Sequence, residues 1–303
     1  MSWLTDARFR RISYALVLGW ILGLSLFLLL GSDSFSAFYP GDLPGFYVPG
    51  VIFDRGLFSE LYNFDLQRSL ENEFWPTAHN AYYAFAYPPY TAVLLWPLAW
   101  LTPISAKIVW TIIQLFACGG TLFFLSRLCA FSPHTRFAIY VLLLSCAPIM
   151  TSLMGAQNTC FSAFLFAGTL YFLNVDTPRG HSLAGLFAGA LLYKPQFGLI
   201  LIAYLLALRN WRAASGAGFM GFLFYLLGAS VQGWNWPQLW LNHANSFGLQ
   251  NYIVNGHQMV SLHGILFTVS QLFTNTPSHL SLVLWICTLM SFFLIAWVLL
   301  RCF

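Results

Sequence analysis

Carboxylates are concentrated in one part of this 303-residue chain, where seven of its nine acidic residues lie between Asp33 and Glu73. A partly desolvated carboxylate can act as a general base or bind a sugar hydroxyl. Asp42, in the stretch Gly41-Asp42-Leu43-Pro44, is one candidate for this role, and Asp33 competes with it. By position alone, Asp42 could equally be a solvated turn residue. Four other acids are expected on the solvated faces of short helices: Asp54, Asp65, Glu71 and Glu73.

Lys194 is the basic residue whose surroundings best suit chemistry. It follows the apolar residues Leu191, Leu192 and Tyr193 and precedes Pro195. An ionisable residue within an apolar run is costly to bury and is usually functional. We therefore predict that Lys194 meets an anionic group, such as a phosphate. The alternative is a lysine that extends along the surface from a helix end to reach water.

Other polar residues give weaker signals. Gln157 and Asn158 precede a helix, so they could bind polar ligand groups or cap that helix. His243, His257 and His263 share one late segment, with spacings that match no standard zinc site. One of them could meet a phosphate or a sugar. We predict neither a metal nor a cofactor, because no glycine-rich phosphate loop or metal motif is present.

Composition identifies the class of protein that must hold these residues. The chain is 59% hydrophobic and 7% charged, whereas soluble domains carry roughly 25% charged residues. These values predict an integral membrane protein that contacts membrane lipids. The net charge of +4 does not indicate a nucleic-acid partner, because the basic residues are dispersed at the ends of apolar segments.

The positions of the charges predict the topology. Arg8, Arg10 and Arg11 precede the first apolar run and place the N-terminus in the cytoplasm. We predict an all-α membrane bundle, a single domain over 1–303, with about eight membrane segments and both termini cytoplasmic. The predicted segments are 12–30, 105–126, 137–153, 159–174, two short helices sharing 182–208 and meeting at Lys194, 213–231 and 280–300.

Two segments are expected outside the cell, at 31–104 and 232–279. The stretch 88–101 is short, contains Pro97 and carries Trp96 and Trp100. It is therefore expected to lie in the membrane interface as a helix, although it could also cross the membrane.

Several short motifs occur in an order typical of a known family. They are the Asp after the first helix, Phe46-Tyr47, Leu61-Tyr62, Ala86-Tyr87-Pro88-Pro89, Leu94 to Leu98, Lys107 to Trp110, Gly155 to Asn158, Ala184-Gly185-Leu186, Lys194-Pro195-Gln196 and Arg209 to Arg212. Over roughly residues 40–265, this order resembles glycosyltransferase family 87, which belongs to the GT-C class. Two departures stand out. The family usually has adjacent Gly and Gln where Ala156 intervenes here, and its members commonly have further helices, so the chain is expected to be a short member or a fragment.

The resemblance implies an enzyme of the bacterial plasma membrane with a GT-C-like fold. It would transfer a hexose, mannose in the best-known members, from a polyprenyl-phosphate donor to a glycolipid or glycan acceptor. Transfer would occur on the extracytoplasmic face with inversion. Asp42 would be the catalytic base, and Lys194 and His257 would bind the donor phosphate. The substrate-binding residues implied are Tyr47, Tyr87, Gln157, Asn158 and Gln196.

Two other function classes remain open from the sequence. A flippase or transporter of lipid-linked sugars would use the same lysine and a groove for the lipid, although such proteins more typically show internal repeats. A non-catalytic membrane scaffold would also fit the short chain.

Overall fold

The computed structural model describes residues 19, 40–76, 83–129, 147–175 and 177–255, and these residues form helices and no strand. The chain divides into two compact units, 1–240 and 241–303. Some predictions lie outside the described residues. They are the spans 12–30 and 280–300, Asp33, His257 and His263.

Long apolar helices occur where the hydrophobic runs predicted them. They include α5 (Pro103–Leu128), α8 (Thr159–Asn174) and α11 (Trp211–Gln232), and α7 (Ala147–Met154) lies within the predicted 137–153 run. Among the described residues, α5 and α11 are long and apolar enough to cross a membrane, yet only 28% and 17% of their most apolar windows are buried. An apolar helix face left outside the protein core suits lipid. The described residues thus contain helices and no strand, and two of these helices suit a membrane, while the number of spans and their sidedness stay predictions.

The predicted break at Lys194 is confirmed. Helix α9 (Pro178–Ala190) continues into the short 3₁₀ helix η4 (Leu191–Tyr193), and α10 (Pro195–Ala207) begins directly after Lys194. Lys194 has φ −118° and ψ 88°, outside the helical region, because the ring of a following proline disfavours helical backbone. Lys194 therefore lies at a junction between two helices and not within one.

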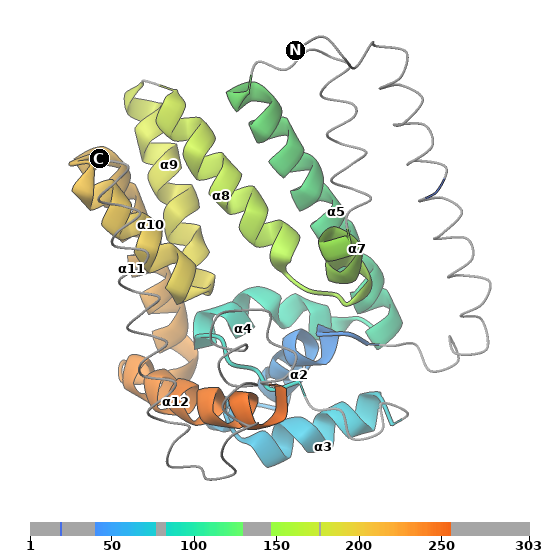
Figure 1. Cartoon of the computed structure of the whole chain (residues 1–303). Coiled ribbons are helices and arrows are strands. Elements are labelled where there is room, and N and C mark those ends of the chain that lie inside the picture. Colours follow the sequence, from blue (N-terminus) through green and yellow to red (C-terminus); the bar gives the residue numbers. More distant parts are fainter. Residues whose placement is uncertain (1–18, 20–39, 77–82, 130–146, 176, 256–303) are drawn as a thin grey trace, which may run out of the picture. The chain divides into compact units, whose positions relative to one another are not determined.

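Small residues bring α9 against α11, and the two helices run side by side in Figure 1. A Cβ on Gly185 would lie 2.0 Å from the carbonyl oxygen of Ala213 in α11. Only glycine permits this approach. The junction between η4 and α10 therefore directly follows a helix, α9, that is packed closely against α11.

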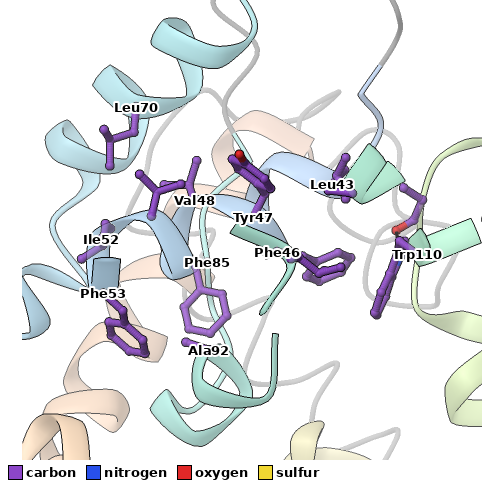
Figure 2. Packing of buried hydrophobic residues seen from close by; sticks show 14 of the residues in the cluster. Leu43, Phe46, Tyr47, Val48, Ile52, Phe53, Leu70, Phe85, Ala92 and Trp110 are labelled. Atoms are coloured by element: carbon purple, nitrogen blue, oxygen red, sulfur yellow. Dashed lines mark hydrogen bonds between the residues drawn. The ribbon is translucent and has the colours of Figure 1, made fainter. Parts of the chain in front are cut away.

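The segment after the first predicted span forms short helices. They are α2 (Leu43–Asp54), η2 (Phe58–Glu60), α3 (Phe64–Phe74), α4 (Pro89–Leu95) and η3 (Trp96–Trp100). Every residue of α2 from Leu43 to Phe53 is buried, and Figure 2 shows Phe46 pointing toward Trp110 of α5. Helix α2 is thus the centre of the hydrophobic cluster in this segment.

The stretch 88–101, predicted to be an interfacial helix, forms α4 followed by η3, while its place in the membrane interface stays a prediction. Its regular helix ends at Leu95, two residues before Pro97, which cannot donate a backbone hydrogen bond. The indole nitrogens of Trp96 and Trp100 lie 2.5 and 3.3 Å from Asp54 Oδ1 at the end of α2. Asp54 is exposed, as predicted, and it also ties η3 to α2.

Residues 236–255 form helix α12 (Trp236–Asn255), within the segment predicted as a polar, aromatic loop. Trp236 packs against Tyr90 with ring centroids 5.4 Å apart, and its indole donates to the Tyr225 carbonyl oxygen. Aromatic packing on α4 and α11 therefore supports the start of a helix that the polar residues of this segment did not suggest.

Glu71 was expected on a solvated helix face, and this prediction is wrong. Its exposed fraction is 3%, and the Tyr83 amide donates to its carboxylate, with the shorter N–O distance 3.0 Å. One turn earlier, Gln67 accepts from the Phe85 amide at 3.0 Å. Burial raises the pKa of Glu71 from 4.5 to about 7. Residues 83–85 belong to no helix, so their amides need other hydrogen-bond acceptors, and α3 supplies two of them from its buried face.

Glu71→Gln should stabilise the protein above pH 7. Because the folded pKa is raised, the folded state binds the extra proton between pH 4.5 and about 7, and stability falls as pH rises through this window. Glutamine keeps an acceptor for the Tyr83 amide without the buried charge, so we expect a gain of about 1–3 kcal/mol. Thermal unfolding in detergent across this pH range measures it.

Glu73→Gln is the matched control, because Glu73 is half-exposed and pairs with Arg55 at 2.7 Å. An exposed pair contributes roughly 0–1 kcal/mol, so this variant should change stability little. A Glu71→Gln protein that is less stable than the wild type above pH 7 would show that Glu71 serves as a carboxylate.

Candidate active site

Asp42 is held at the start of α2 by the turn between α7 and α8. Its backbone N–H donates to the carbonyl oxygen of Gly155 at 2.7 Å. The preceding Gly41 has φ +58°, and a Cβ there would lie 2.2 Å from the same oxygen. Glycine at position 41 therefore allows both the left-handed backbone and the close approach that place Asp42 beside this turn.

The turn at residues 155–158 is itself fixed by two hydrogen bonds. The indole of Trp110 in α5 donates to the carbonyl oxygen of Ala156 at 2.8 Å, and the amide of Gln157 donates to the Ser152 carbonyl oxygen at 2.8 Å. Ala156, the residue that departs from the family motif, is buried and has φ +52°. A non-glycine residue in this region is uncommon and requires support from its surroundings.

Asn158 is positioned to cap α8, but its side chain makes no capping hydrogen bond. Its Nδ2 donates instead to the Tyr87 hydroxyl oxygen at 2.9 Å. Its carbonyl oxygen accepts from the Tyr193 hydroxyl at 3.2 Å, and Tyr193 also shares a short hydrogen bond with Ser162. The rings of Tyr87 and Tyr193 stack with centroids 6.3 Å apart. Asn158 thus links the segment before α4 to the η4–α10 junction.

Lys194 lies within electrostatic reach of Asp42. Burial raises the pKa of the Asp42 carboxyl, and the positive charge of Lys194 opposes this rise. The Lys194 Nζ lies 6.0 Å from the ring centroid of Tyr193 and 5.8 Å from that of Phe197. Among the residues that the structure describes, Asp42 and Lys194 form no ion pair with each other. Asp42 and Lys194 are thus two opposite charges within electrostatic reach of each other that are not joined by an ion pair.

The structure therefore brings together Asp42, Tyr87, Asn158 and Lys194 from the predicted set. Tyr47 lies elsewhere in the hydrophobic cluster, where its hydroxyl donates to the Leu101 carbonyl oxygen at 2.8 Å.

Gln157 contributes its backbone to the turn, and Gln196 is exposed at the start of α10. His243 is buried on α12, and His257 lies outside the described residues. In the described part of the chain, no three His, Cys, Asp or Glu side chains cluster as metal ligands.

Sequence reasoning missed Tyr193 and Trp110 as site residues. Tyr193 is 5% exposed and contacts both Tyr87 and Asn158, and Trp110 supports the Ala156 carbonyl. Tyr193 could have been found from the sequence, because its phenol directly precedes Lys194 in an apolar run. For Trp110 the sequence offered only its place in the Lys107 to Trp110 motif, because its hydrogen-bond partner Ala156 lies 46 residues away.

Comparison with known proteins identifies the family. The model of glycosyltransferase family 87 matches residues 85–303, which is most of the chain. The chain belongs to glycosyltransferase family 87. It is accordingly a membrane glycosyltransferase, an enzyme that uses a sugar donor and an acceptor. No curated protein and no solved structure matches the chain. The family match includes Tyr87, Asn158 and Lys194 and begins after Asp42.

Gly41→Ala should destabilise this glycosyltransferase by displacing Asp42 from the turn. The new Cβ meets the Gly155 carbonyl at 2.2 Å, in addition to the cost of a left-handed alanine, about 1–2 kcal/mol. Thermal unfolding in detergent measures the total loss.

Gly56→Ala is the matched control, because Gly56 has φ +71° and no atom lies within 4 Å of the position that a Cβ would take. It carries the backbone cost without the steric clash. Equal losses for the two variants would mean that the contact between Gly41 and Gly155 contributes nothing.

Proposed function

We propose that this glycosyltransferase transfers a hexose, mannose by its family resemblance, from a polyprenyl-phosphate donor to an acceptor hydroxyl group. The acceptor would be a glycolipid or glycan. Transfer would take place on the extracytoplasmic face of a bacterial plasma membrane, with both chain termini in the cytoplasm and with inversion at the anomeric carbon.

The observation that carries the proposal is the juxtaposition of Asp42 and Lys194. They are 152 positions apart in sequence, each at the start of a helix, and their charges influence each other without forming an ion pair. Transfer from a sugar phosphate requires a base for the acceptor proton and a cation for the leaving phosphate. Asp42 and Lys194 supply one of each.

In the proposed reaction, the acceptor oxygen attacks the anomeric carbon and forms the new glycosidic bond. The bond between that carbon and the phosphate oxygen breaks, and its electron pair passes to the phosphate. The proton of the acceptor hydroxyl moves to Asp42. The donor phosphodiester becomes a polyprenyl phosphate monoester, and Lys194 stabilises the negative charge that develops on it.

The environment of Asp42 suits a base. Burial raises its pKa, which strengthens the carboxylate as a proton acceptor. Lys194 limits this rise and so favours the ionised carboxylate that a base requires. The same lysine would thus serve both the donor phosphate and the ionisation of the base.

Asp42→Asn should abolish transfer while leaving folding and membrane insertion intact. Loss of a general base typically costs about 10²- to 10⁴-fold in rate. Purified protein with a labelled polyprenyl-phosphate mannose and a membrane-extract acceptor measures the turnover. Asp65→Asn, an exposed carboxylate in the first turn of α3, is the control and should be fully active. If Asp42→Asn retained near-normal turnover and Asp33→Asn did not, Asp33 would be the base.

Lys194→Met should lower turnover and shift the residual activity to higher pH. A base works only when ionised, so activity falls as pH drops through the pKa of Asp42. Lys194 lowers that pKa, and its removal lets burial raise it further. The acid limb of the pH–rate profile measures the shift, with Lys194→Arg as the charge-preserving control. An unchanged acid limb in Lys194→Met would argue against the proposal that Lys194 favours the ionised form of Asp42.

A further inference from the structure

We infer that the Tyr87 hydroxyl donates a hydrogen bond to the attacking hydroxyl of the acceptor, which makes the site selective for alcohol acceptors. This inference rests on the proposed function, with Asp42 as the base. It assigns Tyr87 a specific role in binding the nucleophile, distinct from binding the donor.

Tyr87 is fixed on several sides by its neighbours. Its ring stacks on Tyr193 at 6.3 Å with an interplanar angle of 12° and packs against Phe46 at 5.8 Å. Its carbonyl oxygen accepts from the Tyr62 hydroxyl at 3.1 Å. Such restraint leaves the phenol oxygen little freedom to move, so its position is set before any ligand binds.

The hydrogen bond from Asn158 determines what Tyr87 can offer. Asn158 Nδ2 donates to the Tyr87 oxygen at 2.9 Å, and this contact uses the phenol as an acceptor. A phenol also carries one proton to donate. Among the residues that the structure describes, none accepts that proton through a hydrogen bond. The Tyr87 proton is therefore available to a ligand.

Asp42 and Tyr87 are held by the same turn, Asp42 through the Gly155 carbonyl and Tyr87 through the Asn158 side chain. Phe46, one helical turn after Asp42, contacts the Tyr87 ring. Burial, with a contribution from the Asp42 charge, raises the pKa of Tyr87 to about 12, so the phenol stays protonated. Among the described residues, no hydrogen bond joins Tyr87 to Asp42, and we place the acceptor oxygen between them.

A hydroxyl group matches this donor and acceptor. One lone pair of its oxygen accepts from Tyr87, its proton goes to Asp42, and its second lone pair attacks the anomeric carbon. A neutral amine has one lone pair, so it cannot accept from Tyr87 and attack at the same time. Tyr87 and Asp42 together therefore favour oxygen over nitrogen as the nucleophile.

Tyr87→Phe tests the role of the phenol proton. With farnesyl-phosphate mannose as the donor and octyl α-mannoside as the acceptor, KM for the acceptor should rise about threefold to tenfold, the value of one neutral hydrogen bond. KM for the donor should stay unchanged. Tyr225→Phe is the matched control, because that hydroxyl donates to the Trp234 carbonyl oxygen at 3.2 Å, and its kinetics should match the wild type.

A double variant separates this role from a structural one. Tyr87→Phe leaves Asn158 Nδ2 without its acceptor, and combining it with Asn158→Leu replaces both partners by apolar groups, which restores stability. Stability should recover in the double variant while KM for the acceptor stays raised. Recovery of both would show that Tyr87 acts only through folding and would overturn the inference.

The outcomes for this inference and for the proposed function are distinguishable. If Asp42→Asn is inactive and Tyr87→Phe has a normal KM for the acceptor, the inference about Tyr87 is wrong and the proposed function still holds. An active Asp42→Asn removes the proposed base, and with it the basis of this inference.

Discussion

One backbone hydrogen bond, from the Asp42 amide to the Gly155 carbonyl oxygen, joins the two parts of the chain that form the site. It ties the start of α2 to the turn between two apolar helices. Gly41 makes it possible, because its left-handed backbone and missing side chain let the chain pass directly over Gly155. The positions of Asp42, Asn158 and, through Asn158, the Tyr87 hydroxyl all depend on this contact.

Burial and the charge of Lys194 have opposite effects on the pKa of Asp42, the residue that this contact positions. Removing a carboxylate from water disfavours its ionised form, and a nearby lysine favours it. The tyrosines that surround the two charges supply hydroxyl groups without adding charge, and Tyr193 stacks on Tyr87 while it binds the Asn158 carbonyl. The arrangement holds two opposite charges within electrostatic reach of each other without an ion pair between them, which suits the two proposed substrates: an acceptor hydroxyl at Asp42 and a donor phosphate at Lys194.

The apolar helices supply the rigid side of the site. Glycine and alanine bring α9 and α11 into close contact, and Pro195 ends the helical hydrogen bonding beside that contact. Lys194 therefore projects from a defined junction. On the other side, α2 is buried throughout and Trp110 connects its cluster to the Ala156 carbonyl. The site residues thus come from short segments at helix ends, each held by packing of the helix behind it.

The sequence by itself determined the membrane class, the apolar helices predicted at 105–126, 159–174 and 213–231, the break at Lys194, and the family. These follow from composition, the lengths of the apolar runs and the order of short motifs, which can be read without knowing which distant residues meet. Only the tertiary structure decided that Glu71 is buried, that Asn158 donates to Tyr87 instead of capping α8, and that Asp42 comes close to Lys194. Each of these depends on partners 12 to 152 positions away, and local patterns carry no information about which distant group will meet a side chain.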